Sequence, residues 1–283
     1  MDAEEEGIVA SINRNEFHHN FLKSVIVRLD FQGVLEAEME KVLVLVKPYT
    51  KEQGFSRYVE KNANQIDIAV TDKGVPESIE TTNRIRRQKV YSFIDENRGF
   101  VLDVSKTFIC LTINTTHYTP FDDYCGMVPF VAGVYKENID FFTVTRFGIR
   151  KINECLLEDK GQIQQYFNPE LFNYYSHLEG VNTIQSNYIN VFTHGKHHVN
   201  LMTNVAQGQY EGKTVYSVRL DIDAYMDKPD DVILLLDKHE RQVEINDLLF
   251  EIYTSSLTEK FIALLTSEDD FDSAIMMGVE RND

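Results

Sequence analysis

The sequence contains no tryptophan and only three cysteines, Cys110, Cys125 and Cys155, with no Cys-X-X-Cys pair. An odd, widely spaced set of cysteines argues against a disulfide framework and a structural zinc site, and fits a reducing compartment. No apolar run approaches the roughly 20 residues that a membrane helix needs. The first residues, Met-Asp-Ala-Glu-Glu-Glu, are the opposite of a basic signal-peptide start. We therefore expect a cytoplasmic protein.

Several catalytic and cofactor-binding motifs are also missing. The sequence has no GxxxxGK[ST] or GxGxxG loop, which excludes the standard nucleotide-phosphate loops, and no GxSxG turn around a nucleophilic serine. No cysteine lies in a recognisable catalytic context. The sequence therefore predicts no cofactor and favours a non-enzymatic role.

Acidic residues outnumber basic ones, 45 to 28, and the formal net charge is −17. Such a surface repels phosphate backbones and suits a basic protein partner. One basic run, Arg84, Arg86, Arg87 and Lys89, could contact RNA or an acidic partner; the other interpretation is a strand edge protected by charge. The sequence leaves open whether the protein forms a homo-oligomer.

Strand and helix patterns alternate along the chain. Alternating or β-branched runs predict strands, and Pro120 and Pro229 each open a helical pattern, because proline suits the first turn of a helix. The predicted strands cover residues 21–31, 65–70, 89–95, 100–104, 107–114, 142–153, 188–192, 198–206 and 213–222. The predicted helices cover residues 36–46 (or a helix running into a strand), 120–136, 169–175, 229–250 and 258–266.

The two halves of this pattern are similar. Each has three strands, a short turn and a helix opened by proline, and residues 111–118 align with residues 218–225 without a gap. The pattern predicts an α+β fold: a largely antiparallel sheet from two related βββα halves, with helices packed on one face. We expect a polar N-terminal arm at 1–20, a first half at 21–156, a connection at 157–183, a second half at 184–266 and a frayed acidic tail at 267–283, with the halves forming one joint domain.

One predicted strand carries two arginines on the same face. Residues two apart on a strand share a face, so Arg146, Gly148 and Arg150 point one way, with the arginines about 13 Å apart. Two residues of a later strand, Asp221 and Asp223, also share a face, together with Arg219.

Two interpretations of these residues stay open. In the first, Arg146 and Arg150 pair with Asp221 and Asp223 in a structural ion network that fixes the register between the halves. In the second, the arginines clamp a small anion such as a nucleotide or phosphometabolite, and Gly148 lets that ligand approach the backbone.

Three segments together resemble a known family. They are residues 21–31 (FLKSVIVRLDF), residues 146–153 (RFGIRKIN) and residues 220–250, which contain LDID and a helix with His239 and Phe250. In this order they resemble a sporadically distributed, uncharacterised bacterial protein family with an R-[IF]-G-[LI]-R-x-I-N strand motif. This sequence has Phe147 and Lys151 where the family more often has Ile and Tyr. The resemblance brings no established activity, and the patchy distribution of the family implies defence-related or toxin-neutralising genes.

The histidines and paired aspartates receive structural interpretations. His194, His197 and His198 surround a Gly-Lys turn without a recognised metal spacing, so we expect a solvated hairpin tip and no metal site; His18 and His19 belong to the polar arm. The apolar stripe of the helix after Pro229 includes His239, which predicts a core histidine. Asp122–Asp123 and Asp230–Asp231 lie at predicted helix starts, where carboxylates complement the helix dipole.

The sequence therefore favours a non-enzymatic cytosolic interaction protein, for example an immunity or antitoxin-like protein or an anti-phage defence accessory subunit. The alternatives are a sensor of a small anionic ligand at Arg146 and Arg150, and a hydrolase or nuclease of unrecognised type.

Overall fold

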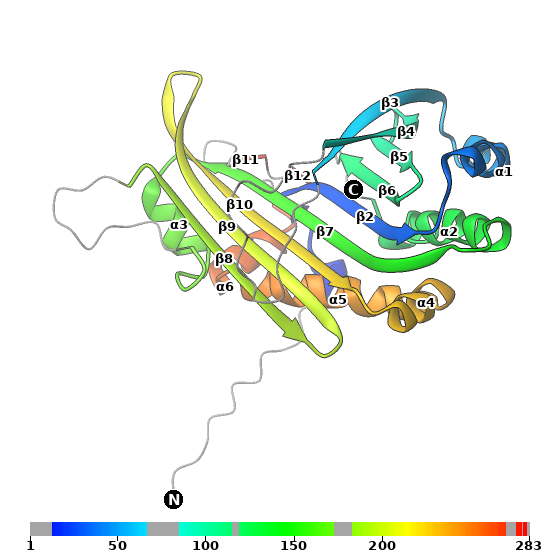
Figure 1. Ribbon diagram of the computed structural model, residues 1–283. Helices are drawn as coiled ribbons and strands as arrows, with labels where there is room; N and C mark the ends of the chain where they lie inside the picture. The colour runs from blue at the N-terminus through cyan, green and yellow to red at the C-terminus, as the bar shows by residue number, and fades with distance from the viewer. Residues whose placement is uncertain are drawn as a thin grey trace, which may run out of the picture.

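The computed structural model describes residues 13–66, 85–114, 119–172, 183–269, 276–278 and 280–281. Its centre is one large antiparallel sheet with helices packed beside it, which confirms the α+β prediction (Figure 1). The neighbouring strands, in spatial order, are β3 (Arg57–Ile66), β4 (Ile85–Asp95), β5 (Phe100–Val104), β6 (Phe108–Asn114), β2 (Leu22–Gln32), β7 (Thr143–Leu157), β10 (Lys213–Met226), β9 (His197–Tyr210) and β8 (Gln185–His194).

The two halves meet at the middle of this sheet. β2 and β7 pair with each other, and each also pairs with the last strand of its own half, β6 or β10. The first half therefore has five strands, β2 to β6, and the repeated unit that follows has four, β7 to β10, against three predicted for each. β7, which the predicted bounds place in the first half, takes the position in the second unit that β2 takes in the first. The helices are α1 (Met39–Glu52), α2 (Met127–Asn138), α3 (Lys160–Tyr166), α4 (Pro229–Asp237), α5 (His239–Ser255) and α6 (Glu259–Leu265).

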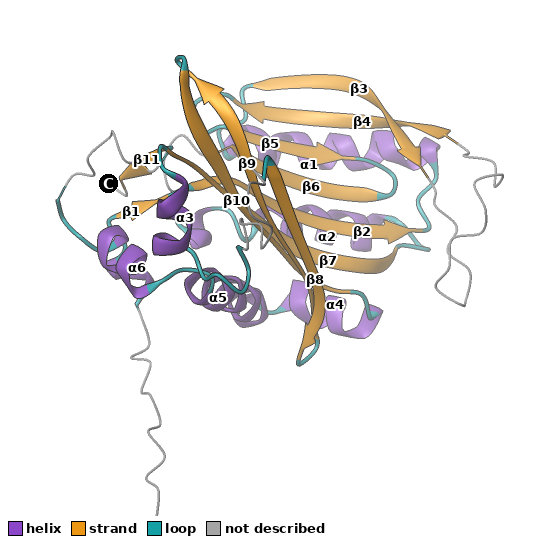
Figure 2. Ribbon diagram, turned by 90° about the vertical axis from the view of Figure 1, so that its left-hand side faces the viewer, coloured by secondary structure: helices purple, strands orange, loops and turns teal. Residues whose placement is uncertain are grey.

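The alternation of apolar and polar residues decides which face of the sheet the helices cover. In β2, Val25, Val27 and Leu29 are buried, whereas Arg28 and Asp30 lie on the opposite face and are half-exposed. Figure 2 shows α1 and α2 behind the strands of the first half, with α4 and α5 continuing along the second half. The sheet therefore has a helix-covered face, which holds the core, and an open face, which carries the polar side chains.

The helices differ from the sequence prediction in four places. α1 continues through Pro48 to Glu52, because its buried stripe, Val42, Val46 and Thr50, runs past the proline. α2 begins at Met127, so Pro129 lies in the first turn, where an amide hydrogen has no helical partner to lose. The helix predicted from Pro229 is two helices that break at Lys238, whose backbone is extended. In the connection, α3 is a helix that was not predicted, and the described part of the predicted helix at 169–175, residues 169–172, is not helical. None of the described helices is long and apolar enough to cross a membrane.

The strands and the ends of the chain also hold differences. β3 lies in a stretch that was predicted to be irregular apart from a short strand at 65–70. Residues 67–70 of that predicted strand lie outside the described residues. The predicted polar arm and frayed tail are partly ordered: β1 (His19–Asn20) pairs with β12 (Glu280–Arg281), and β11 (Met276–Met277) pairs with β7. His19 is only 3% exposed, and its Nε2 lies 3.0 Å from the carbonyl of Asp269, so its assignment to a solvated arm is wrong.

The predicted hairpin between β4 and β5 is present and holds a buried carboxylate. Gly99 supplies the positive φ (+69°) that the turn requires. Asp95 is 4% exposed and accepts hydrogen bonds from the backbone N–H groups of Asn97 (3.0 Å) and Arg98 (3.2 Å) and from Arg98 Nε (2.6 Å). Burial alone would raise the pKa of Asp95, but these hydrogen bonds outweigh it and hold the pKa below its usual value.

We predict that Asp95→Asn lowers the free energy of unfolding at pH 7 by roughly 1–3 kcal/mol, because the turn and Arg98 lose their charged acceptor. A carboxyl with a lowered folded-state pKa stabilises the fold above its unfolded pKa of about 3.9, and this contribution disappears as pH falls through the folded-state value. Urea titrations across the acid range should therefore show the difference shrinking with acidity. Glu96→Gln, in the same turn but exposed, is the control; parallel acid limbs for wild type and Asp95→Asn would contradict the assignment.

Candidate functional site

The two faces of β7 carry different polar groups. Arg146, Gly148 and Arg150 lie on the open face, opposite residues of β2 and β10. On the helix-covered face of the same strand lie Lys151 and Asn153. The sequence drew attention to the first set as the candidate site, and the structure shows what each member contacts.

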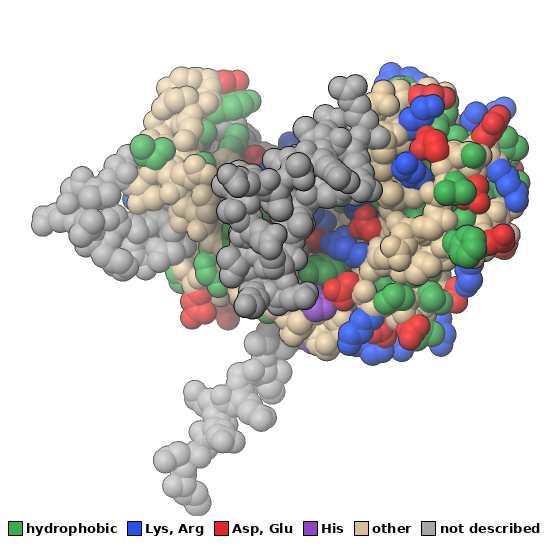
Figure 3. Space-filling view, viewed as in Figure 1, with side chains coloured by type: hydrophobic (Ala, Val, Ile, Leu, Met, Phe, Trp, Pro, Cys, Tyr) green, Lys and Arg blue, Asp and Glu red, His purple; other side chains and the backbone are tan. Residues whose placement is uncertain are grey.

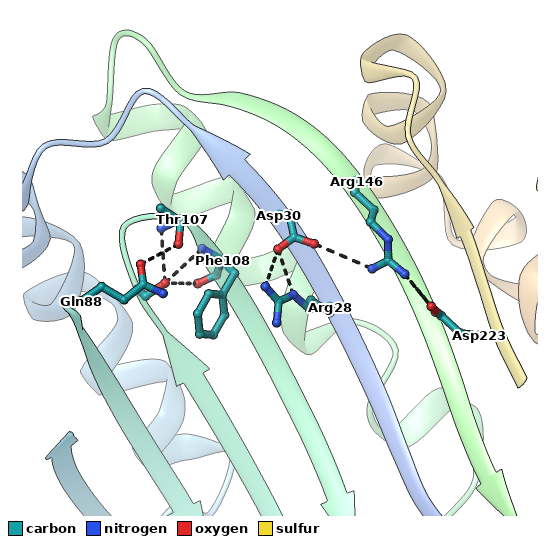
Figure 4. A network of polar contacts seen from close by, with 8 residues as sticks. Arg28, Asp30, Gln88, Thr107, Phe108, Arg146 and Asp223 are labelled. Carbon is teal, nitrogen blue, oxygen red and sulfur yellow. Dashed lines mark hydrogen bonds and ion pairs between the residues drawn. The ribbon is translucent and has the colours of Figure 1, made fainter. Parts of the chain in front are cut away.

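Arg146 is the centre of a chain of ion pairs that crosses three strands (Figure 4). Its Nη2 donates to both carboxylate oxygens of Asp223 on β10, at 3.0 and 2.8 Å, and its Nη1 lies 3.7 Å from Asp30 Oδ2 on β2. Asp30 also accepts from Arg28 Nε and Nη2 at 2.8 and 2.7 Å. Both arginines lie over aromatic rings, Arg146 at 4.4 Å from the centre of Tyr225 and Arg28 at 4.5 Å from Phe108. The first half is thus linked to the second through β7.

Arg150 forms the shorter of the two contacts between the motif arginines and the aspartates of β10. Its Nε and Nη2 donate to the two oxygens of Asp221 at 2.7 and 2.6 Å, a bidentate pair. Asp221 is 3% exposed, and Arg219 Nη2 also approaches it at 3.5 Å. The hydrogen bond that Arg150 donates to Asp221 is the main reason that the pKa of Arg150 is raised above its usual value. The guanidinium therefore stays charged and has its carboxylate partner within the chain.

Gly148 is explained by its neighbours within the protein. A Cβ at this position would lie 2.9 Å from Tyr225 Cβ and 3.0 and 3.1 Å from Arg146 Nη2 and Nη1. The glycine therefore lets the guanidinium of Arg146 fold back over the strand and lie on Tyr225. The space that the anion-clamp interpretation reserved for a ligand is filled by Arg146 itself.

The ion network predicted from the sequence did not include Arg28, Asp30 or Asn200. Arg28 and Asp30 belong to the predicted strand 21–31, where they alternate with the buried residues Val27 and Leu29. This alternation is a sequence signal that places their side chains on the open face. Asn200 of β9, which donates to Asp223 Oδ2 at 3.3 Å, carries no comparable signal. Because the neighbours of a strand follow from tertiary pairing, sequence spacing alone does not identify them.

A second polar cluster lies where the start of α2 meets the start of α5. His239 Nδ1 is 3.6 Å from Cys125 Sγ, and its Nε2 is 3.4 Å from Asp122 Oδ1. The side chain of His239 is 54% exposed, so its prediction as a core histidine is wrong: the break at Lys238 places it at a helix start instead of on a buried stripe. Burial and the carboxylates of Asp122 and Asp123 raise the pKa of the Cys125 thiol, which disfavours the thiolate that a nucleophile requires.

These three side chains are also the group, among the residues the structure describes, that could hold a metal ion. A thiol, an imidazole and a carboxylate suit Zn²⁺, and one ligand atom from each lies within 4.8 Å of the others. Asp122 and His239 are exposed and a fourth protein ligand is not part of the group. We therefore describe the cluster as a histidine–carboxylate contact beside a buried thiol.

The remaining predicted features are placed as follows. At the turn between β8 and β9, His194 pairs opposite His197, while His198 stacks on Tyr225 and lies 3.4 Å from Asp227 Oδ1. Arg84 lies outside the described residues. β4, which holds the rest of the basic run, is not the terminal strand of the sheet, because β3 lies beyond it.

Comparisons with known proteins assign neither a family nor a function to this chain. No protein-family model and no curated protein matches the sequence. Among solved structures, the RNA triphosphatase Pct1 of S. pombe, in complex with the Spt5 CTD, aligns over 88% of this chain and 86% of that chain. The identity is 7% and the TM-score 0.13, which carries no argument about fold or function.

We predict that Gly148→Ala lowers the free energy of unfolding by roughly 1–3 kcal/mol, because the added methyl group must displace Tyr225 or the Arg146 guanidinium. Gly208→Ala in β9 is the matched control, since a Cβ there meets nothing within 4 Å. Guanidinium chloride titrations of both variants measure the difference. Equal stabilities for the two variants would show that Arg146 does not need the space above Gly148.

Proposed function

We propose that the protein is a non-enzymatic interaction protein that binds an extended segment of a partner protein along the edge strand β8. The observation that carries this proposal is the contrast between the two ends of the sheet. β3, at one end, carries Arg57, Glu60 and Lys61. β8, at the other end, has the sequence QSNYINVFTH, without a single Lys, Arg, Asp or Glu. Charged residues protect an edge strand from pairing with another chain, and β8 lacks that protection.

Exposed apolar side chains strengthen the case for this edge. Ile189 and Val191 share the open face of β8 and are 66% and 65% exposed. Met202, which pairs opposite Ile189 on β9, is 38% exposed. Together they form an apolar strip on β8, which among the described strands pairs with β9 alone. Strand addition uses this combination, because main-chain hydrogen bonds supply affinity and alternate side chains supply specificity.

The charge of the protein indicates the chemistry of the partner segment. A net charge of −17 attracts a basic chain, so we expect the segment to alternate apolar residues with Lys or Arg. Figure 3 shows acidic and basic side chains intermixed over the lobe that carries β3–β6 and α1, so the described part of this face does not present a continuous basic patch to a phosphate backbone. An immunity, antitoxin-like or defence-accessory role requires this kind of protein contact.

The alternative functions have weaker support. A sensor of small anions at Arg146 and Arg150 would have to compete with Asp223 and Asp221, which already hold both guanidinium groups at hydrogen-bond distance. A hydrolase would need an activated nucleophile or a general base in a cleft, and the Cys125–His239 contact has a thiol whose pKa is raised.

We predict that the double substitution Ile189→Lys and Val191→Lys abolishes partner binding, because two ammonium groups would be buried against a basic segment. The tagged full chain is used to purify partners from its native host, with quantitative mass spectrometry comparing wild type and variant. The partner found is then purified, and its affinity for each form is measured by calorimetry. A loss of at least about 100-fold is expected, equivalent to two buried unpaired groups at about 1.4 kcal/mol each.

The control is the double substitution Val44→Lys and Leu45→Lys. These side chains are exposed (63% and 43%) and belong to α1 of the first half, whereas β8 is the terminal strand of the second half. This variant should bind the partner like wild type. Light scattering of the purified protein identifies the case in which the partner is a second copy of this chain. Equal binding by wild type and the β8 variant would refute the proposal, and so would turnover of nucleotides or nucleic acid by the purified protein.

A further inference from the structure

The helix-covered face of β7 borders a cavity that differs from the open face in its charge balance. The cavity measures about 310 Å³ and lies between the N-terminal segment 14–22, β7 and α5. Its described lining residues include Arg14, His18 and Lys151 and no aspartate or glutamate. In a chain with a net charge of −17, this is a local reversal of charge.

Lys151 is the charged group in this cavity whose charge is least neutralised by its described neighbours. Its ammonium donates to Asn246 Oδ1 at 2.6 Å, a neutral amide, and no carboxylate of the described residues lies within ion-pair distance. The nearest acid in its surroundings, Asp247, already accepts from Arg14 Nη2 at 3.1 Å. Burial, followed by repulsion from Arg14, lowers the pKa of Lys151 to about 7. A cation in this position lacks a counter-ion.

Two neighbouring residues each have one donor atom without an acceptor. Arg14 Nε and Tyr253 Oη are buried without a hydrogen-bond partner among the described residues, and both residues line the cavity. A buried donor without a partner costs free energy, and an acceptor oxygen entering beside Lys151 would relieve that cost. The rest of the wall is apolar, with the rings of Phe17 and Phe250 5.5 Å apart.

We propose that this cavity binds a small organic carboxylate, with Lys151 as its counter-ion and the aromatic wall holding its apolar body. The volume is at the lower end for ligand pockets, about 300–1,000 Å³, so the ligand is no larger than a single substituted ring or a short chain. The inference concerns the opposite face of β7 from the ion network and does not depend on the partner contact at β8.

Binding of an anion has a measurable signature. A carboxylate beside Lys151 favours its charged form, so the amine takes up a proton when the ligand binds, roughly half a proton at pH 7. Among the described residues, the other charged or titratable groups that line the cavity or act on the amine are Arg14, His18, Asp247 and Tyr253, and Cys155 acts on Tyr253. Of these, His18 also lines the cavity with an ionisable imidazole, and it needs a control of its own.

The experiment uses benzoate as the carboxylate probe and benzamide as its uncharged counterpart, with the full chain, by titration calorimetry at pH 7 in two buffers that differ in ionisation enthalpy. We expect saturable one-to-one binding of benzoate with proton uptake, and at least about tenfold weaker binding of benzamide. Lys151→Met should weaken benzoate by at least about tenfold and remove the uptake. His18→Asn should leave the uptake in place.

Lys151→Arg separates charge from titration, because an arginine stays protonated: it should keep benzoate binding and lose the proton uptake. If this variant does not fold, Lys151→Met decides, since methionine fits a buried stem without charge. Equal affinities for benzoate and benzamide, no saturable benzoate binding, or unchanged affinity in Lys151→Met would each overturn the proposal.

Discussion

The pairing of guanidinium groups with carboxylates is the interaction on which the register of the three central strands, β2, β7 and β10, depends. β2 and β7 meet side by side, and a shift of one residue between them would turn every core residue toward solvent. Arg146 contacts aspartates on both sides of its strand, and Arg150 contacts Asp221. Apolar packing rewards any register that keeps the buried face buried, whereas the bidentate Arg150–Asp221 pair rewards one register of β7 against β10, and the Arg146–Asp30 ion pair at 3.7 Å rewards one register of β7 against β2. We therefore regard the network as the element that specifies the register.

The ion pairs on the open face also limit where the protein can bind a ligand or a partner. Because the carboxylates of β2 and β10 neutralise the motif arginines, what remains available is elsewhere: an uncharged edge at β8, and a cationic cavity behind β7. Among the described residues, β8 is paired to a strand on one side only, and the Lys151 ammonium has a neutral amide acceptor but no carboxylate partner. Unpaired groups are costly, so they indicate binding more directly than a satisfied network does.

The sequence predicted the features that follow from alternation along one element. The faces of β7 and β10, the hairpin at Gly99 and the α+β class all come from residue spacing and turn chemistry. The features it missed depend on which elements meet. Lys238 breaks a helix that its apolar stripe would have continued, and His239 consequently faces Asp122 and Cys125. The cavity at Lys151 needs the N-terminal segment to cross α5, as the contact between Arg14 and Asp247 shows. Neither event leaves a periodic signal in the sequence.

A double-mutant cycle on Arg150 and Asp221 tests the central claim most directly. The free energies of unfolding of wild type, Arg150→Met, Asp221→Leu and the double variant give the coupling between the two side chains without reference to any ligand. The account predicts a coupling energy of about 1–3 kcal/mol, with the double variant more stable than the sum of the single losses implies. Additive losses would contradict it and leave the register to be specified by apolar packing alone.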